Sequence, residues 1–551
     1  MTAHIHKENL LNHCAEAAST VYDECAAIAL TEEVSQITCS SLTGCGPALV
    51  NLLSRQASIV HCLCQSTSRT AATDKETNLS RNYDLALKRL DDIASIAHSK
   101  FYAFLFKDLP VCWRQLYTDA QILKFCLLLL RSPYTIHHEA NDWAFHELVS
   151  ENNDCLDELV KTLDLALILA GAAGERRGRK WIDRALELLQ SIWREEITAQ
   201  AFNGSSTISR DRPTKRTKLM DHTATRGCHF GSATFSTIEP FTPRVRNSIS
   251  KVDALSIGEF QTYVNKPRDP TVGPKPLILC NAINEWPALS TRPWNRPSYL
   301  LSQTFDGRRL VPVEIGRSYV DEGWGQRLIT FGEFLREYID PSLSSGSESP
   351  KGHGSDASPN KARAIAYLAQ HQLFTQLPNL RNDILIPDYC YTSPPRHPSD
   401  PLVDQPELDE PLLNAWFGPP GTISPLHNDP YHNILTQVVG RKYVRLYSPL
   451  ETARLAARGK ENGVEMSNTS LIDVGVLEGW DMPAGTHDGD HDEANRDSEE
   501  EHMRSAMVEE FKTVPFVDCI LEPGDALYIP IGWWHYVRGL SVSFSVSFWW
   551  N

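Results

Sequence analysis

The first 200 residues carry apolar positions at the spacing of amphipathic helices. Apolar residues recur every three or four positions between residues 85 and 97, with charged residues between them, and the same spacing returns at 156–167 and 181–192. Side chains three and four apart share one face of an α-helix, so this pattern predicts a helical domain over residues 1–200. No repeat period is strong enough to predict a solenoid.

Short runs of β-branched and aromatic residues replace the helical pattern from about residue 236. They alternate with turn residues, as in PLILC, RLVPVEIG, YVRLYSP and SVSFSVSF. Such runs predict a strand-rich domain over residues 236–551. Residues 201–235 are rich in Ser, Thr, Lys and Arg, which predicts a flexible linker. Two polar insertions, about 342–360 and 484–504, are predicted to be disordered.

Composition and charge narrow the classes of protein to consider. The chain has 551 residues, which suggests two to four domains, and a formal net charge of -16. So acidic a chain is a poor general binder of nucleic-acid phosphates. Its 13 cysteines include no CxxC pair, which is typical of reduced thiols. With neither a signal peptide nor a membrane-spanning stretch in the sequence, we expect a nuclear and/or cytoplasmic protein that binds no membrane.

A short basic cluster lies inside the predicted linker and bears on location. It consists of Arg210, Arg212, Lys215, Arg216 and Lys218. Runs of this kind act as nuclear localisation signals, but they also occur in linkers that are merely solvated. Composition alone leaves both interpretations open.

The segment WFGPPGTISPLHNDPYHN, residues 416–433, holds two candidate metal ligands. His427 and Asp429 are two residues apart, so on an extended segment their side chains point to one face. A third candidate is His535, which ends the apolar strand predicted in PGDALYIPIGWWHYV. Two histidines and one carboxylate can hold Fe(II) by one face and leave the other open for reactants. The HxD pair alone is equally a pattern for a structural hydrogen bond.

Lys442 indicates a binding site for an anion near these ligands. It follows a turn predicted at Val439–Arg441 and shares a strand face with Val444 and Leu446. A lysine on an otherwise apolar face needs an anionic partner, or its pKa must fall. The distal carboxylate of 2-oxoglutarate would be such a partner. The alternative is a lysine whose ammonium group reaches solvent.

Residues Ser541–Phe548 alternate strictly between small hydroxyl side chains and bulky apolar ones. This predicts a strand. One interpretation is a barrel wall whose serine face borders a polar cavity. The other is a half-exposed strand with its serines in water.

Together, these segments resemble the JmjC family of Fe(II)- and 2-oxoglutarate-dependent oxygenases. The resemblance is carried by VPVEIGRSYVDEGW (311–324), YLAQHQLFTQLPNLRNDILIPDYC (367–390) and residues 414–449 and 523–551. It implies an α+β multidomain chain, with an all-α N-terminal half followed by a double-stranded β-helix, a cupin-like barrel with flanking helices.

The resemblance also implies roles for individual residues. Iron would be held by His427, Asp429 and His535. The cosubstrate 2-oxoglutarate would be bound by Lys442, Asn433, Tyr367 and Ser424, and O2 would be the co-reactant. A protein or peptide substrate would face Glu314, Tyr319 and Trp324, with Trp416 and Gln370 nearby. The departures from the family pattern lie mainly in the insertions, and whether the chain forms a homodimer stays open.

Three functions are compatible with these residues. The leading hypothesis is hydroxylation of an arginine side chain, because a carboxylate such as Glu314 beside aromatic rings can bind a guanidinium by paired hydrogen bonds. Alternatively, Glu314 only pairs with a neighbour such as Arg317. The second hypothesis is demethylation of histone methyl-lysine, and the third is a non-catalytic scaffold.

Overall fold

The computed structural model divides the chain into two compact units. It describes residues 2–30, 42–66, 76–104, 108–131, 154–204, 234–340 without 254 and 322, 365–482 without 462, and 498–551. One unit comprises Met1–Cys228 with Arg308–Leu310, and the other comprises His229–Gly307 with Val311–Asn551. The basic cluster at 210–218 and the insertion predicted at 342–360 lie outside the described residues. The predicted limits of the helical domain, linker and barrel domain stay predictions.

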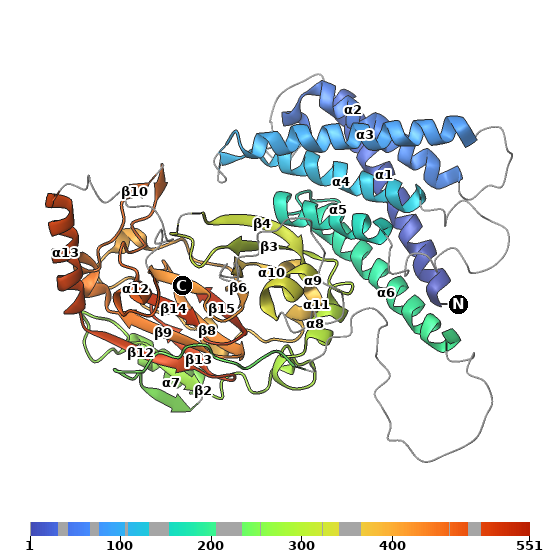
Figure 1. Cartoon of the computed structure of the whole chain (residues 1–551). Helices are drawn as coiled ribbons and strands as arrows, with labels where there is room; N and C mark the ends of the chain where they lie inside the picture. Colours follow the sequence, from blue (N-terminus) through green and yellow to red (C-terminus); the bar gives the residue numbers. More distant parts are fainter. Residues whose placement is uncertain are drawn as a thin grey trace, which may run out of the picture. The chain divides into compact units, whose positions relative to one another are not determined.

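The described part of residues 1–228 in the first unit is built from helices and their connections (Figure 1). Its α-helices are α1 (Thr2–Leu30), α2 (Pro47–Ser66), α3 (Glu76–Phe101), α4 (Val111–Arg131), α5 (Asp154–Ala170) and α6 (Gly178–Gly204). On α3 the predicted apolar face is buried at Leu90, Ile93 and Ala97, whereas Leu85 and Ile96 are exposed. The apolar stripe is therefore narrower than the sequence pattern predicts. None of the described helices combines the length and the apolar character that a bilayer span requires.

The second unit is built on two sheets. The larger sheet has the order β1-β2-β13-β8-β15-β6-β5-β3-β4, and the smaller has the order β12-β9-β14-β7. The strands of the larger sheet are β1 (Lys251–Asp253), β2 (Leu277–Cys280), β3 (Leu310–Ile315), β4 (Gly325–Thr330), β5 (Ala366–His371), β6 (Leu412–Gly418), β8 (His432–Val439), β13 (Ala526–Ile529) and β15 (Ser543–Trp550). The smaller sheet contains β7 (Ile423–His427), β9 (Lys442–Tyr447), β12 (Phe516–Leu521) and β14 (Trp534–Gly539).

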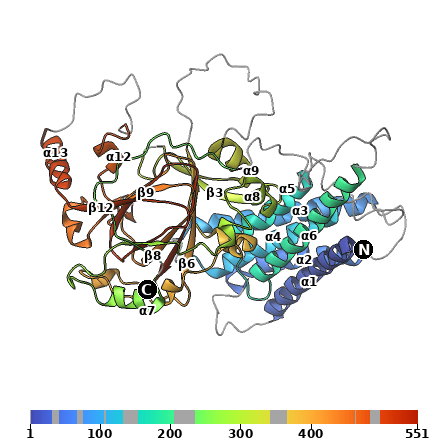
Figure 2. The same cartoon turned by 90° about the horizontal axis from the view of Figure 1, so that it is seen from below.

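The chain passes from one sheet to the other at nearly every turn of the barrel. In both β6–β7–β8–β9 and β12–β13–β14–β15, successive strands belong alternately to the two sheets. This alternation winds the chain into the predicted double-stranded β-helix, whose two sheets face each other (Figures 1 and 2). A short hairpin of β10 (Lys460–Glu461) and β11 (Val464–Glu465) interrupts the connection between β9 and β12.

Two turns decide how the sheets are joined. Gly440, between β8 and β9, has φ +66°, and an added Cβ would lie 1.9 Å from the Val542 carbonyl oxygen. Gly532, with φ +77°, lies between β13 and β14. PGDALYIPIGWWHYV therefore forms two strands in different sheets, and His535 lies near the start of β14. The prediction of one strand ending at His535 was wrong, because a residue with positive φ reverses the chain there.

The outer face of the larger sheet packs against helices and carries the main apolar core. Phe544, Val546 and Phe548 of β15 belong to this core, and the Phe417 and Phe544 rings stack at 4.7 Å. The opposite face of β15 carries its serines, and every residue of the strand is buried. The half-exposed alternative is therefore wrong for this strand.

Helices cover the barrel at several points. They are α7 (Ile257–Asn265), α8 (Pro297–Gln303), α9 (Phe331–Phe334), α10 (Leu373–Gln376), α11 (Pro378–Arg381), α12 (Val474–Leu477) and α13 (Ser498–Lys512). The start of α13 corrects one expectation, because residues 498–504 of the second predicted insertion are helical. The rest of that insertion, 484–497, lies outside the described residues.

Candidate metal centre and cosubstrate pocket

The three candidate metal ligands meet on the smaller sheet. His427 is the last residue of β7, Asp429 follows in the loop before β8, and His535 belongs to β14. Because β7 and β14 are antiparallel neighbours with His427 opposite His535, residues more than 100 positions apart in sequence become adjacent. Their ligand atoms all lie within 4.8 Å of one another, and no other such group occurs among the described residues.

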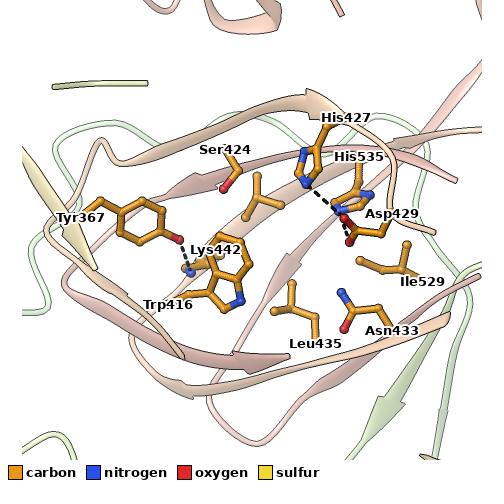
Figure 3. A pocket seen from close by; sticks show the side chains of 11 residues that line it. Tyr367, Trp416, Ser424, His427, Asp429, Asn433, Leu435, Lys442, Ile529 and His535 are labelled. Carbon is orange, nitrogen blue, oxygen red and sulfur yellow. Dashed lines mark hydrogen bonds and ion pairs between the residues drawn. The ribbon is translucent and has the colours of Figure 1, made fainter. Parts of the chain in front are cut away.

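The histidine rings present the nitrogen that a metal needs. His427 Nε2 lies 3.8 Å from Asp429 Oδ1, and His535 Nε2 lies 3.5 Å from Asp429 Oδ2 (Figure 3). On the far side of each ring, His427 Nδ1 donates to the Pro425 carbonyl at 2.7 Å and His535 Nδ1 donates to the Trp533 carbonyl at 3.0 Å. Such bonds fix the tautomer and leave Nε2 free to coordinate.

The protonation states of His427 and Asp429 also suit the binding of a metal ion. Burial lowers the pKa of His427 to about 4, so its ring is neutral near pH 7. Burial favours protonation of Asp429, but its contacts with the neighbouring His535 and His427 rings outweigh this effect, and the pKa of Asp429 is lowered. A neutral imidazole and an ionised carboxylate are the forms that bind Fe(II). His432 is not part of this group of ligands, because its ring forms hydrogen bonds with Tyr528 OH and with the Pro395 carbonyl, each at 2.8 Å.

A pocket extends from these ligands into the barrel (Figure 3). All four residues expected to bind the cosubstrate lie along it together with the three metal ligands. The lining is Tyr367, Trp416, Ser424, His427, Asp429, Asn433, Leu435, Lys442, Ile529, His535 and Val537. Leu435 and Val537 were not predicted from the sequence. They are two residues beyond Asn433 and His535, so the two-residue period of a strand could have identified them.

Lys442 is buried at the inner end of this pocket, with 1% of its surface exposed. Its Nζ donates to Tyr367 OH at 3.1 Å, and no carboxylate of the described residues is in ion-pair contact with it. Burial lowers the pKa of Lys442 to about 7. The alternative of a lysine that reaches solvent is therefore wrong.

The pocket fits an anionic ligand that also accepts or donates hydrogen bonds. The Lys442 amine is buried without a carboxylate partner among the described residues, and Asn433 Oδ1 is buried without a hydrogen-bond partner. Buried polar atoms of this kind are costly unless a ligand satisfies them. A small dicarboxylate such as 2-oxoglutarate, with one end at Lys442 and the other toward the metal ligands, meets this requirement.

Glu314 lies beside the pocket on β3. It pairs directly with Tyr367 of β5, so both side chains point to the same side of the sheet. Burial raises the pKa of Glu314, and a hydrogen bond from the Trp324 side chain partly offsets this effect. Among the described residues no cation pairs with Glu314.

Arg317 is engaged elsewhere, so it does not neutralise Glu314. Its guanidinium group pairs with Asp321, Asp473 and Asp481. The alternative in which Glu314 simply pairs with Arg317 is therefore wrong. The sequence offered no signal for this cluster, because Asp473 and Asp481 lie more than 150 residues from Arg317.

The other expected substrate residues differ in their positions. Tyr319 OH lies 3.3 Å from Thr469 Oγ1, and Thr469 forms a β-bridge with the ligand His427. Trp416 lines the pocket and donates from Nε1 to Ser547 Oγ at 2.9 Å. Gln370 is exposed at an irregularity of β5, with φ +46°, and is not part of the pocket lining.

Comparisons with known proteins agree with this geometry. The cupin-like domain family matches residues 266–551. A Danio rerio protein named lysine-specific demethylase 8 is 29% identical over 467 residues, which cover 85% of this chain and 88% of the relative. Jumonji C domain-containing protein 5 of Drosophila melanogaster is 37% identical over 336 residues, 60% of this chain and 68% of the relative. Lysine-specific demethylase JMJ30 of Arabidopsis thaliana is 39% identical over 276 residues, half of each chain.

The family match covers every strand of the two sheets except β1, and it includes each candidate ligand and each pocket residue described above. The relatives carry JmjC or demethylase names. The fold, the residues that line the pocket and these matches lead to one conclusion: the chain belongs to the JmjC family of cupin-like proteins and is a 2-oxoglutarate-dependent oxygenase.

Proposed function

We propose that this chain hydroxylates an arginine side chain in a protein or peptide substrate, using Fe(II), 2-oxoglutarate and O2. The observation that carries the proposal is the half-buried carboxylate of Glu314, which lies beside the pocket and pairs with no Lys, Arg or His among the described residues. A partly desolvated carboxylate without a cationic partner is unfavourable, and a substrate cation would relieve that cost.

The metal and the cosubstrate supply the oxidising chemistry that places an oxygen atom on a C–H bond. The residues of the chain bind and orient them. His427, Asp429 and His535 would hold Fe(II) on one face and leave the opposite positions open. Lys442, Tyr367, Ser424 and Asn433 would hold 2-oxoglutarate, with the Lys442 ammonium group at the distal carboxylate.

The surroundings of Glu314 favour a planar cation. A guanidinium can donate two parallel hydrogen bonds to one carboxylate, and its flat face can stack on an aromatic ring. Trp324 donates to Glu314 and has 36% of its surface exposed, so its ring is available to a substrate. A dimethyl- or trimethyl-ammonium group cannot make the paired bonds.

Lysine demethylation is the second candidate, and the names of the relatives favour it. The same oxidation on an N-methyl carbon gives an unstable product that releases the methyl group. The third hypothesis, a non-catalytic scaffold, does not agree with membership of an oxygenase family and an intact ligand set. A nuclear and/or cytoplasmic location and a homodimer remain proposals.

Mass spectrometry of treated peptides separates the two reactions. Purified protein with Fe(II), 2-oxoglutarate and O2 should add one oxygen atom to arginine peptides, and Glu314→Gln should suppress this. Glu337→Gln, which changes an exposed carboxylate of the same unit, is the matched control. If dimethyl-lysine peptides lose methyl groups while arginine peptides stay unmodified, the demethylase hypothesis replaces this one.

A further inference from the structure

The loop between β3 and β4, residues 316–324, carries two of the aromatic side chains that flank the proposed substrate position. Trp324 donates a hydrogen bond to Glu314, and Tyr319 OH lies 3.3 Å from Thr469 Oγ1. Thr469 in turn bridges to the metal ligand His427. The position of this loop therefore sets the distance between the aromatic rings, Glu314 and the metal centre.

Arg317 connects the loop at residues 316–324 to residues that are distant in the sequence, through hydrogen bonds and ion pairs. Within the loop, its Nε and Nη2 donate to the two oxygens of Asp321 at 3.0 and 3.1 Å. Outside the loop, its Nη1 donates to Asp481 Oδ2 at 3.1 Å, and its Nη2 also donates to Asp473. The guanidinium is largely covered, with 20% of the side chain exposed, so solvent screens these contacts less than it screens a surface pair.

The two distant carboxylates are held in place without Arg317. Asp473 Oδ1 accepts from the backbone N–H groups of Gly475 and Val476 at 2.9 and 3.1 Å, which caps α12. Asp481 Oδ2 accepts from Arg538 Nη1 at 2.7 Å, on the strand that carries His535. Arg317 therefore docks onto acceptors that are already fixed, and the element it positions is its own loop.

The charges of the cluster explain why the loop would move without this side chain. Three carboxylates (Asp321, Asp473, Asp481) face two guanidinium groups (Arg317, Arg538). Removal of the Arg317 charge would leave Asp321 of the loop close to two like charges. Because like charges repel in a partly dry site, the loop would shift away from α12.

From these contacts we infer that Arg317 is a positioning residue that determines substrate selectivity. It holds Tyr319 and Trp324 beside Glu314, so that a flat guanidinium fits between the rings and the carboxylate. The inference rests on the proposed function only for the identity of the substrate side chain. Arg317 is neither one of the residues that line the pocket nor one of the metal ligands.

Steady-state kinetics test the inference with three variants. Arg317→Gln should raise the KM for the peptide about tenfold, while kcat, the KM for 2-oxoglutarate and succinate release without peptide stay unchanged. Arg317→Lys keeps the charge and should recover part of the loss. Arg327→Gln removes an exposed arginine of β4 and is the matched control, with no expected effect. An unchanged peptide KM in Arg317→Gln would overturn the inference, and so would an equal loss of peptide-free turnover.

Hydrogen exchange gives a readout that does not need the reaction. In Arg317→Gln, exchange should accelerate at residues 317–324, where the Asp321 and Trp324 amides close tight turns, and stay unchanged in β7 and β14.

If Arg317→Gln does not fold, Asp473→Asn replaces it, since an asparagine still caps α12 but has lost the charge. Faster exchange throughout the barrel, or none in the loop, would contradict the inference. If arginine peptides are not modified by the unaltered protein, the proposed function fails, whereas the exchange result still decides the role of Arg317.

Discussion

Glu314 of β3 and Tyr367 of β5 lie directly opposite each other in the larger sheet, and their side chains point to the same side. The Tyr367 hydroxyl also accepts from Lys442 Nζ at 3.1 Å, so one tyrosine separates the acidic group from the buried ammonium group. The proposed substrate position and the proposed cosubstrate position are therefore adjacent, and substitutions at each can be tested separately.

Loss of a metal ligand should abolish turnover without unfolding the barrel. His427→Ala and Asp429→Ala each remove one of three ligands, so we expect no iron-dependent succinate release and much weaker binding of Fe(II) or Co(II). The thermal midpoint of the metal-free protein should change by only a few degrees, on the order expected for about 1 kcal/mol. Undiminished iron-dependent turnover in both variants would refute the assignment.

A nearby histidine supplies a contrast. His432 is buried and bonded to Tyr528 and Pro395, away from the metal ligands. His432→Ala should leave metal affinity unchanged but lower the free energy of unfolding by about 1–3 kcal/mol, because buried polar atoms lose their partners. Denaturant unfolding and metal titration measure the two effects. Lost metal affinity at unchanged stability would place His432 in the metal centre instead.

Removal of the buried ammonium group should weaken cosubstrate binding. A charge-assisted hydrogen bond in a partly dry site contributes about 1.5–3 kcal/mol, so Lys442→Ala should raise the Kd for 2-oxoglutarate roughly ten- to a hundredfold or more. Arg441→Ala, at the neighbouring position, removes a cation that pairs with Glu239 and Glu522 at the surface and should leave that Kd unchanged. Calorimetric titration of both variants makes the comparison.

The pKa of Lys442 predicts proton uptake on binding. In the free protein, burial lowers this pKa to about 7, and a bound carboxylate raises it. At pH 8 the ligand should therefore draw a proton onto Lys442, seen as a dependence of the binding enthalpy on the ionisation enthalpy of the buffer. Lys442→Arg, which is always charged, should show no uptake there, and the same absence in the unaltered protein would contradict the prediction.

The same shift affects the stability of the ligand-free protein. Between pH 7 and the ordinary lysine pKa of about 10.4, the unfolded chain binds more protons at this position than the folded chain. The contribution of Lys442 to the free energy of unfolding is therefore most unfavourable below pH 7 and becomes less so as the pH rises through this range.

Gly440 should tolerate no side chain. An added Cβ would lie 1.9 Å from the Val542 carbonyl oxygen, and φ is +66°. We expect Gly440→Ala to destabilise the barrel by about 3 kcal/mol or more, since strain adds to the cost of left-handed backbone. Gly463→Ala is the control, because that glycine has φ +85° but open space around it and should lose only about 1 kcal/mol. Equal losses in the two variants would contradict the steric argument.

The basic cluster at 210–218 lies outside the described residues, and its role stays a prediction. If it acts as a nuclear localisation signal, replacement of Lys215, Arg216 and Lys218 by alanine should reduce nuclear accumulation of the tagged protein. Normal nuclear accumulation of that variant would remove the localisation hypothesis.

Local spacing explains which parts of the site could be predicted. The two-residue step from His427 to Asp429 and the isolated polar Lys442 are features of single segments, and both are readable along the chain. The pairing of His427 with His535 depends on β7 and β14 becoming neighbours, which only the fold decides. The sequence could therefore name His535 only as a candidate third ligand, and the family resemblance then implied the complete set.

Long-range and irregular features could not be predicted. Arg317 finds partners 156 and 164 residues away, and no local pattern indicates them. Gln370 was expected near the substrate because the family resemblance implied it. The irregular pairing of β5 breaks the alternation of its faces, and Gln370 is exposed.

Lys442 lies opposite Leu521 in the pairing of β9 with β12, and this register does not depend on the length of chain between the two strands. That connection carries the β10–β11 hairpin, α12, the acidic insertion and α13. Insertions and deletions between Asp481 and β12, beyond the contacts of Thr469 with His427 and of Asp473 and Asp481 with Arg317, can change the surface while the metal centre stays unaltered. Descendants of this barrel can thus acquire new protein targets by evolving one connection, without rebuilding the catalyst.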